Sequence, residues 1–490
     1  MRVLRAAALV AAAAALAMLT GCTGTSAAPE AAPAARDVAV QLFERPWTSI
    51  ADECETTIGP AGFAWVLTSP PQEHIAGPQW WTSYQPVSYA LTSRLGTEAE
   101  FADMVSRCAD AGVGIIADAV INHMAGIDGG VGTGGTRFTH YAYPGLYDET
   151  DFHHCALTDD DDIADYTSRE QVQTCELSNL ADLDTSSPRV QAAIEGYLGH
   201  LLDLGVAGFR IDAAKHIAAD DLAEIVGALP GDPLIWSEVI RGAASEPVQP
   251  EEYTGFGEVF EFQYARDLGP ALKAGIVGDP ELGDTRPLHV DSDRAVVFVD
   301  NHDTERGEAS LTYRDGGLYL IANALMLADD YGTPVVYSGY AFSDRDAGPP
   351  AGSDGAALGG TCDGVTGPKA AYDDGERVCT EAWTAIAGLL ELRRFAGDAP
   401  RLPGVSDGDV SGFERQGRAL VLVNTEDAAA EASVATTLPD GAYCDVVSGG
   451  ARSAASGTCT GTTVTVDGGT ARAEVPAEGV VAVHIGAMRR

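Results

Sequence analysis

The chain has 490 residues, of which 45% are hydrophobic, and its formal net charge is −42 at pH 7. A chain of this length buries a large core and is expected to form two or three domains. The excess of carboxylates excludes nucleic acid and other phosphate-rich partners, which it would repel, and is typical of a soluble acidic surface.

The N-terminus predicts export. Residues 1–21 have Arg2 and Arg5 ahead of an Ala/Leu-rich run, which is the pattern of a signal peptide. The run ends in "LTGC", which resembles the processing box of bacterial lipoproteins, so Cys22 is predicted to become the lipidated first residue. Ordinary signal cleavage with an incidental cysteine is the alternative. Residues 22–36 have the composition of a flexible linker. We therefore expect an extracellular protein that meets the membrane only through a lipid anchor.

The cysteines predict disulfides. Nine are present, and setting Cys22 aside leaves an even number in an exported chain. No C-x-x-C cluster indicates zinc. Pairing in sequence order is our prediction, with the bridges Cys54–Cys108, Cys155–Cys175, Cys362–Cys379 and Cys444–Cys459.

Predicted strands alternate with predicted helices along much of the chain. Short apolar or β-branched runs begin near residues 38, 62, 112, 205, 233, 258, 294 and 333. Helix-length amphipathic stretches such as "TEAEFADMVSRCADAG" and "SSPRVQAAIEGYLGHLLDLG" lie between several of them. This alternation predicts an α/β fold, a TIM (β/α)8 barrel with a parallel sheet.

Two segments depart from the alternation. Residues 124–182, after the third predicted strand, form a Gly-, Asp- and Tyr-rich excursion that is too long for a loop without structure of its own. We predict an inserted subdomain there. Residues 396–490 contain short alternating strands such as "ALVLVNTE" and "GVVAVHIG", which predict a C-terminal antiparallel β-sandwich. The barrel is then formed by residues 37–123 and 183–395.

Polar side chains gather where predicted strands end. The third, fourth, fifth and seventh strands close with Asn122, His123, Arg210, Asp212, Glu238, His302 and Asp303. Active sites of parallel barrels lie at this face, because the loops vary while the strand ends stay at fixed separations. A lone residue of this kind could be a structural hydrogen-bonding group, but four such strand ends indicate a site.

Several of these segments resemble a known family. "DAVINHM", "GFRIDAAKH", "WSEV" and "FVDNHD" match, in this order, the four signature segments of the alpha-amylase family of glycoside hydrolases. "WWTSYQPVSY" matches a fifth stretch. The resemblance covers residues 38–485 and points to the animal-type and actinobacterial members. It implies a barrel with an inserted calcium-bearing subdomain, and retaining hydrolysis of internal α-1,4-glucosidic bonds in starch, glycogen and maltooligosaccharides.

The resemblance also implies the catalytic roles. Asp212 matches the nucleophile, Glu238 the general acid/base and Asp303 the third carboxylate, which binds sugar hydroxyls and stabilises the transition state. Retention needs two carboxyl groups about 5–5.5 Å apart, one ionised and one protonated. Arg210 shares a strand face with Asp212 and should favour its ionised form, while neighbouring carboxylates should keep Glu238 protonated. An ion pair that merely pins the barrel is the alternative.

Further positions match residues that bind sugar or metal in the family. The substrate-binding set is Trp81, Tyr84, Gln85, His123, Arg210, Lys215 and His302. For the aromatic residues, stacking on sugar rings is weighed against ordinary core packing. The calcium set comprises the side chains of Asn122 and Asp182 and the backbone carbonyls of Gln173 and His216. Such oxygen ligands suit a hard cation.

Three features differ from the animal pattern or stand apart from it. "TERGEASLTYRD" follows "NHD" and lacks the Gly-rich mobile loop of the animal enzymes. Val335 stands where those enzymes place a second basic residue beside a bound chloride, so we expect activity without chloride. The acidic stretch "DETDFHH", residues 148–154, is expected to be solvated loop charge.

Two other functions are compatible with these segments. One is a sibling enzyme that transfers glucosyl units or releases one specific maltooligosaccharide. The other is a non-catalytic glucan-binding lipoprotein on the same scaffold, which the intact Asp212, Glu238 and Asp303 argue against. We expect a monomer.

Overall fold

The computed structural model describes residues 33–275, 288–450 and 458–489. The predicted signal peptide, residues 1–21, and the lipidation site Cys22 lie outside these residues. The last part of the predicted linker is docked on the barrel: the Ala34 amide donates to the Arg394 carbonyl at 2.7 Å, and Arg36 Nη1 donates to the Gly112 carbonyl at 3.1 Å. In the part of the chain that the structure describes, no helix has the length and apolar character needed to cross a bilayer.

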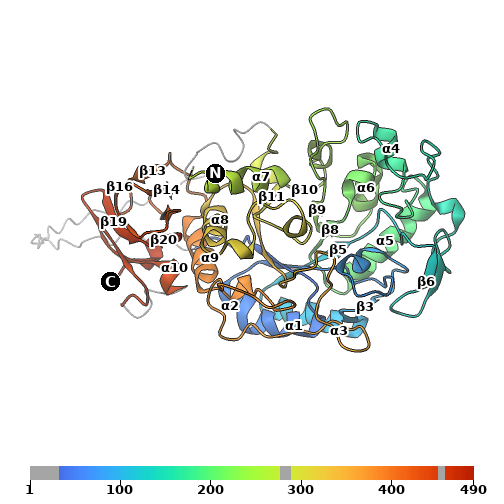
Figure 1. Cartoon of the computed structure of the whole chain (residues 1–490), viewed down its shortest axis with the longest axis horizontal. Helices are drawn as coiled ribbons and strands as arrows, with labels where there is room; N and C mark the ends of the chain where they lie inside the picture. The colour runs from blue at the N-terminus through green and yellow to red at the C-terminus, as the bar shows by residue number, and fades with distance from the viewer. Residues whose placement is uncertain (1–32, 276–287, 451–457, 490) are drawn as a thin grey trace, which may run out of the picture.

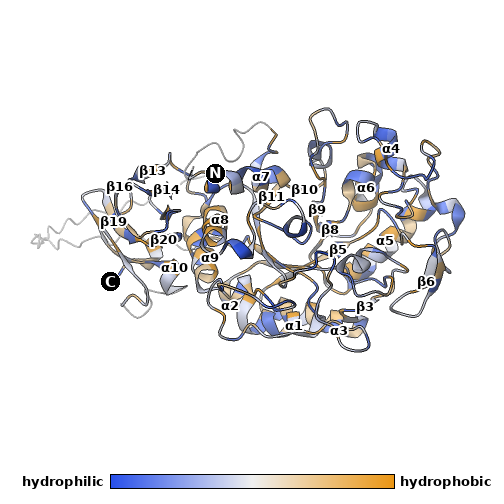
Figure 2. Ribbon diagram, in the orientation of Figure 1, coloured by the Kyte–Doolittle hydropathy of each residue, from blue (hydrophilic) through white to orange (hydrophobic). Residues whose placement is uncertain are grey.

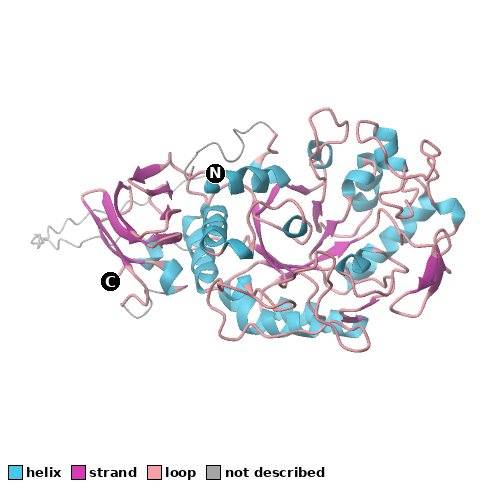
Figure 3. Ribbon diagram, viewed as in Figure 1, coloured by secondary structure: helices cyan, strands magenta, loops and turns pink. Residues whose placement is uncertain are grey.

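A closed barrel of parallel strands forms the centre of the molecule (Figures 1 and 3). In order around the barrel, its strands are β1 (Ala39–Leu42), β2 (Trp65–Thr68), β5 (Gly114–Ala119), β8 (Gly208–Ile211), β9 (Leu234–Ser237), β10 (Glu258–Phe260), β11 (Ala295–Phe298) and β12 (Thr333–Ser338). Pairing of Ala39 with Val335 closes the ring between β1 and β12. Each strand lies within one of the runs predicted from the sequence, so the predicted barrel is confirmed.

The strands are buried on both faces. Side chains that point into the barrel form one apolar cluster that includes Ala39, Leu67, Ile116, Trp236, Val296, Phe298 and Val335. Their neighbours along the strands point outward and join the larger core beneath the helices, including Val40, Val66, Ile115, Ile235 and Val297. The alternation follows from the period of two in a strand. Burial on both faces explains why these runs are almost continuously apolar.

Helices cover the outside of the barrel. They are α1 (Trp47–Glu53), α2 (Gly59–Ala61), α3 (Glu98–Asp110), α5 (Pro188–Asp203), α6 (Ala219–Gly227), α7 (Phe262–Lys273), α8 (Gly317–Ala328) and α9 (Thr384–Ala396). Helix α3 begins with a capping box, in which Thr97 and Glu100 exchange side-chain and backbone hydrogen bonds. Helix α8 is apolar almost throughout, as Figure 2 shows, because it packs against barrel strands and against the C-terminal sheet.

The chain between β5 and β8 holds a two-stranded sheet, β6 (Gly129–Val131) with β7 (Arg137–Thr139), and helix α4 (Arg169–Thr174). The expectation of solvated charge in "DETDFHH" is wrong at two positions. Asp151 is buried and lies 3.0 Å from Arg189 Nη1, and His153 Nδ1 lies 2.7 Å from Asp182 Oδ2. These partners are 29 or more residues away, beyond what a local charge pattern reveals.

Two four-stranded antiparallel sheets form the C-terminal domain. One contains β13 (Val405–Asp407), β14 (Val410–Arg415), β15 (Ala419–Asn424) and β20 (Gly479–His484). The other contains β16 (Ala430–Ala435), β19 (Thr470–Val475), β18 (Thr463–Asp467) and β17 (Gly441–Cys444), with the short helix α10 (Val446–Gly449) nearby. The predicted fold class is confirmed. The domain boundaries themselves stay predictions.

All four predicted disulfides are present, namely Cys54–Cys108, Cys155–Cys175, Cys362–Cys379 and Cys444–Cys459. The second bridge lies within the segment between β5 and β8, and the fourth within the C-terminal domain.

Candidate active site

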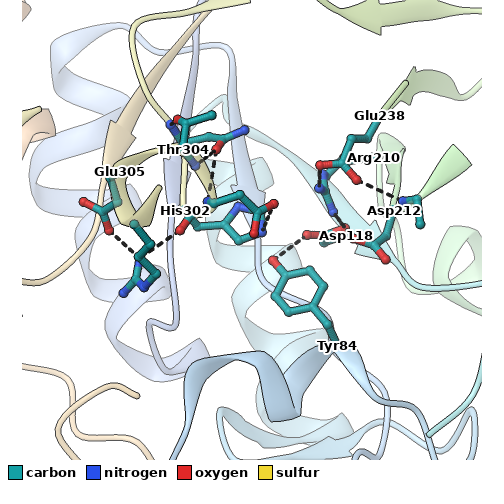
Figure 4. Close-up of polar contacts among 12 residues, drawn as sticks. Tyr84, Asp118, Arg210, Asp212, Glu238, His302, Thr304 and Glu305 are labelled. Carbon is teal, nitrogen blue, oxygen red and sulfur yellow. Dashed lines mark hydrogen bonds and ion pairs between the residues drawn. The ribbon is translucent and has the colours of Figure 1, made fainter. Parts of the chain in front are cut away.

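The buried guanidinium of Arg210 lies among three carboxyl groups at the carboxyl ends of the strands (Figure 4). Its Nη1 donates to Asp118 Oδ1 at 2.6 Å and to Asp212 Oδ1 at 2.8 Å. Its Nη2 lies 2.6 Å from Glu238 Oε1. One cation therefore brings together side chains from three neighbouring strands.

The register of the parallel sheet produces this arrangement. Asp118 on β5 pairs directly with Arg210 on β8, and Asp212 follows two residues later on the same face. Ile211 pairs with Ser237 at the end of β9, so Glu238 emerges beside Asp212. Glu238 Oε2 also accepts a hydrogen bond from the Ala213 amide at 3.0 Å.

Burial and charge shift the ionisation of these groups. Burial raises the pKa of Glu238; Arg210 opposes the rise, and the charges of Asp212 and Asp303 add to it. Burial also raises the pKa of Asp212, and the ion pair with Arg210 opposes that rise. Three buried carboxyl groups around one guanidinium cannot all ionise at low cost. The cluster is therefore suited to hold one proton and one carboxylate side by side.

His302 and Asp303 lie next to this cluster, after β11. His302 is buried and stacks on Tyr84, with ring centroids 5.0 Å apart, and its Nδ1 lies 3.0 Å from Gln41 Nε2. Burial lowers the pKa of His302 well below its ordinary value, so the imidazole is neutral. The Asp303 side chain is 40% exposed and its Oδ2 lies 3.4 Å from His302 Nε2. A carboxylate open to solvent beside a neutral imidazole can bind hydroxyl groups.

Tyr84 links the aromatic part of the site to the charged cluster. Its hydroxyl donates to Asp118 Oδ2 at 2.9 Å, and its carbonyl oxygen lies 3.0 Å from His123 Nε2. Burial lowers the pKa of His123 to about 4, so this imidazole is neutral as well. Trp81 is half-buried against the core, and Gln85 Oε1 accepts from the Gly126 amide at 3.0 Å.

Lys215 lies between the barrel and the segment that follows β5. Its Nζ donates to the Ile240 carbonyl at 3.1 Å and to Glu246 Oε2 at 2.7 Å, and it lies 5.3 Å from the ring centroid of Tyr166. Tyr166 and Ile240 are both exposed. The lysine is therefore held in place beside apolar surface that faces solvent.

The residues predicted to hold calcium fall into two groups of contacts. Asn122 Nδ2 donates to Asp182 Oδ1 at 3.2 Å, and both residues are buried. Gln173 Nε2 donates to the Ile217 carbonyl at 3.4 Å, and His216 Nδ1 lies 2.9 Å from the Val172 carbonyl, so helix α4 packs against the His216 segment. The Asp182 carboxylate, the Asn122 side-chain amide and backbone carbonyls supply the kind of oxygen ligands that a hard cation takes.

Comparison with known proteins agrees with this architecture. Residues 405–486 match the model of the "Alpha amylase, C-terminal all-beta domain". An alpha-amylase from Streptomyces violaceus is 43% identical over 482 residues, which cover 97% of this chain and 79% of that protein. An alpha-amylase from Tenebrio molitor is 38% identical, covering 92% of this chain and 98% of its own. The chain belongs to the alpha-amylase family.

Solved structures place it in the same family. The crystal structure of alpha-amylase I from Eisenia fetida matches with a TM-score of 0.82 and 32% identity, covering 93% of this chain and 98% of that chain. A cyclomaltodextrin glucanotransferase with a TM-score of 0.65 is only 19% identical and shares the fold alone.

Two residues of the site are not among those predicted from the sequence. Asp118, the second carboxylate on Arg210 Nη1, is the first residue of "DAVINHM", and its place at the end of β5 was a usable signal. Trp80 is the neighbour of the predicted Trp81, and its ring meets those of Tyr84 and His302 edge-on, with centroids 5.9 and 5.7 Å apart. Both tryptophans are half-buried, Trp81 against the main core and Trp80 against the cluster that contains Tyr84, and the sequence does not distinguish them.

Asp118 should be required for stability, because Asp118→Ala leaves the fully buried guanidinium of Arg210 with one partner fewer. We expect the free energy of unfolding, measured by urea denaturation, to fall by about 3 kcal/mol. The matched control is Asp52→Ala, which removes a 71% exposed partner of Arg107 and should cost less than about 1 kcal/mol. Equal losses in the two variants would show that the Asp118 ion pair has no special weight.

Proposed function

We propose that the protein hydrolyses internal α-1,4-glucosidic bonds of starch, glycogen and maltooligosaccharides with retention of configuration. The observation that supports this most directly is the pair of contacts from one guanidinium to two carboxyl groups, Arg210 to Asp212 at 2.8 Å and to Glu238 at 2.6 Å. Carboxyl groups bound to one planar guanidinium lie close together. Close spacing is what a retaining mechanism needs, at about 5–5.5 Å.

In this proposal Asp212 is the nucleophile and Glu238 is the general acid/base. The Asp212 carboxylate attacks the anomeric carbon, while Glu238 gives its proton to the departing glycosidic oxygen. Glu238, now ionised, then takes a proton from water, and the resulting hydroxide displaces Asp212 from the sugar. Burial of Glu238, which is 6% exposed, raises its pKa and so favours the protonated form that this step needs.

The remaining residues bind the sugar. Asp303, being half-exposed, would accept hydrogen bonds from hydroxyl groups of the ring that is attacked. The neutral imidazoles of His123 and His302 can both donate and accept such bonds. Trp81 and Tyr84 would present aromatic faces to the apolar faces of sugar rings. Gln85 completes this side of the site, and Lys215 would contact the leaving-group side.

Two alternatives remain as outcomes of one experiment. A time course of products from soluble starch and from short maltooligosaccharides separates an endo-hydrolase from an enzyme that releases one product or transfers glucosyl units. A non-catalytic glucan-binding protein would bind starch and release no reducing ends. Such a protein would have no use for Asp212, Glu238 and Asp303 together.

Asp212→Asn and Glu238→Gln should each lower turnover of soluble starch by about 10⁴-fold or more, with unchanged circular dichroism, because the two groups act as a unit. Either variant retaining activity within tenfold of the parent would rule out these roles.

Since burial raises the pKa of Glu238, the parent should lose activity only as the pH rises above the ordinary range of a glutamic acid. The pH profile of kcat checks this.

We also propose that calcium binds between the barrel and the segment after β5, held by the side chains of Asn122 and Asp182 and the carbonyls of Gln173 and His216. The buried Asp182 carboxyl, with its pKa raised by burial to about 7, supports this because a divalent cation would offset the cost of its charge. The ion would tie the two parts of the chain together.

Removal of calcium should lower both the melting temperature and the activity, and both should recover when calcium is restored. The measurement is a melting curve in excess chelator and again after calcium is added back. Asp182→Asn should show a smaller calcium-dependent shift than the parent. A parent melting curve that is identical with and without chelator would contradict the calcium site.

Chloride should not be required. Val335 is buried in the apolar interior of the barrel beside Ala39 and Phe298, so no second cation stands there. Arg210 is already engaged by carboxyl groups, and Asn301 Oδ1 accepts from the Asp303 and Thr304 amides. Burying an anion in this setting would be costly. Starch hydrolysis at constant ionic strength should change less than about twofold when chloride replaces acetate. A severalfold activation at millimolar chloride would contradict this.

The cellular location of the protein is proposed from the sequence. Residues 1–21 and Cys22 support export and a lipid anchor on the outer face of the cell membrane, with release into the medium as the alternative.

We also propose that the protein is monomeric, and that the domain boundaries fall at residues 123/124, 182/183 and 395/396.

A further inference from the structure

Arg306 is a buried cation close to the proposed catalytic groups. It ends the short helical turn η7 (Thr304–Arg306), three residues after Asp303, and its side chain is 2% exposed. The guanidinium lies over four aromatic rings, and the distance from its Cζ to their centroids is 4.3 to 5.4 Å. The rings belong to Phe342, Phe43, Trp80 and Tyr340. The rings come from the chain after β1, β2 and β12. One cation therefore holds three loops of the catalytic face together.

Hydrogen bonds connect Arg306 to the catalytic segment. Its Nη1 donates to the His302 carbonyl at 2.9 Å and to Glu305 Oε1 at 2.5 Å. The Tyr337 hydroxyl, on β12, donates to the same Glu305 oxygen at 2.6 Å. Figure 4 shows Glu305 and His302 among these contacts. The result is a continuous chain of hydrogen bonds from β12 to the peptide group that precedes Asp303.

That peptide group sets the direction of Asp303. The Asp303 side chain is half-exposed and makes one contact, with His302 at 3.4 Å, among those found in the described residues. Its backbone is fixed more firmly, because the Asp303 and Thr304 amides both donate to Asn301 Oδ1, at 3.0 and 2.8 Å. Since a peptide unit is planar, a bond that holds the His302 carbonyl also fixes the plane entering Asp303.

The free-energy cost of burying Arg306 also indicates a functional role for this residue. Its Nε and Nη2 are buried and have no hydrogen-bond partner among the described residues. An apolar side chain would fill a cage of aromatic rings without that cost, and the cation–π contacts and the Glu305 ion pair repay only part of it. A costly group of this kind is expected where function needs it.

We propose that Arg306 is a positioning residue that aims Asp303, and with it His302, at the sugar. The inference rests on the proposed role of Asp303.

The first test is kinetic. Arg306→Met fills the aromatic cage but removes the donor to the His302 carbonyl, and Arg306→Lys keeps the charge. We expect Arg306→Met to lower kcat on maltooligosaccharides by about 100-fold, with KM within about threefold of the parent, since misplacement by about 1 Å has an effect of this size. Arg306→Lys should recover part of the loss. Affinity for acarbose, which resembles the transition state, should fall along with kcat, whereas affinity for maltotriose should not.

Arg401→Met is the matched control. Arg401 is half-buried, with 10% of its side chain exposed; it pairs with Asp329 at 2.5 Å and lies 4.1 Å from the Phe413 ring centroid. Asp329 precedes β12, so this pair lies at the end of the barrel away from the proposed site. We expect a similar loss of melting temperature and a change in kcat of less than about twofold at 25 °C. An equal loss of kcat in Arg401→Met would reduce Arg306 to a stability role.

The second test is a double-mutant cycle with Asp303→Asn. If Arg306 acts through Asp303, Arg306→Met should cost less than about threefold in kcat once Asp303 is replaced. The same 100-fold loss of kcat in both backgrounds would overturn the proposal. A kcat of Arg306→Met within threefold of the parent's would overturn it as well. If Arg306→Met does not fold, Arg306→Lys provides the same cycle. If the parent protein releases no reducing ends from starch, the proposed function itself is overturned. Measuring the parent therefore separates a failure of that function from a failure of the role of Arg306.

Discussion

The ion-pair cluster around Arg210 is the interaction on which the site depends. Asp118, Asp212 and Glu238 could not be buried next to one another without a cation among them, since each buried carboxylate is costly when unpaired. The guanidinium reaches all three because its planar fork offers donors in fixed directions. Arg210 therefore offsets the free-energy cost of burying three carboxyl groups side by side, and it also shifts their ionisation.

The barrel makes that cluster possible. Its interior below the site is filled by apolar side chains such as Trp236, Phe298 and Val335, so the strand ends cannot move inward. The parallel register then places Asp118 opposite Arg210 and Glu238 beside Asp212. Loops above the strand ends add what the strands cannot supply. The aromatic cage around Arg306 ties three of them together next to Asp303.

The segment between β5 and β8 shares the main apolar core with the barrel, through residues such as Phe138 and Phe152, and polar contacts add to this attachment near the site. Lys215 lies against Tyr166 from this segment, and Asn122 at the end of β5 meets Asp182 at its far end. His153 holds the second oxygen of Asp182 at 2.7 Å. Such contacts depend on charge, which explains why a bound cation at this place would be expected to affect stability and activity together.

The sequence by itself determined the barrel strands, the four disulfides and most residue types of the site. Strand runs and signature segments are local patterns, and an even set of cysteines in sequence order left a simple pairing to test. The tertiary structure alone decided which groups touch. Asp118 and Arg210 are 92 residues apart, and the Arg306 cage joins Phe43 to Phe342. No local pattern reveals such contacts, because they follow from the register of the closed sheet and from loops that meet only after it has closed.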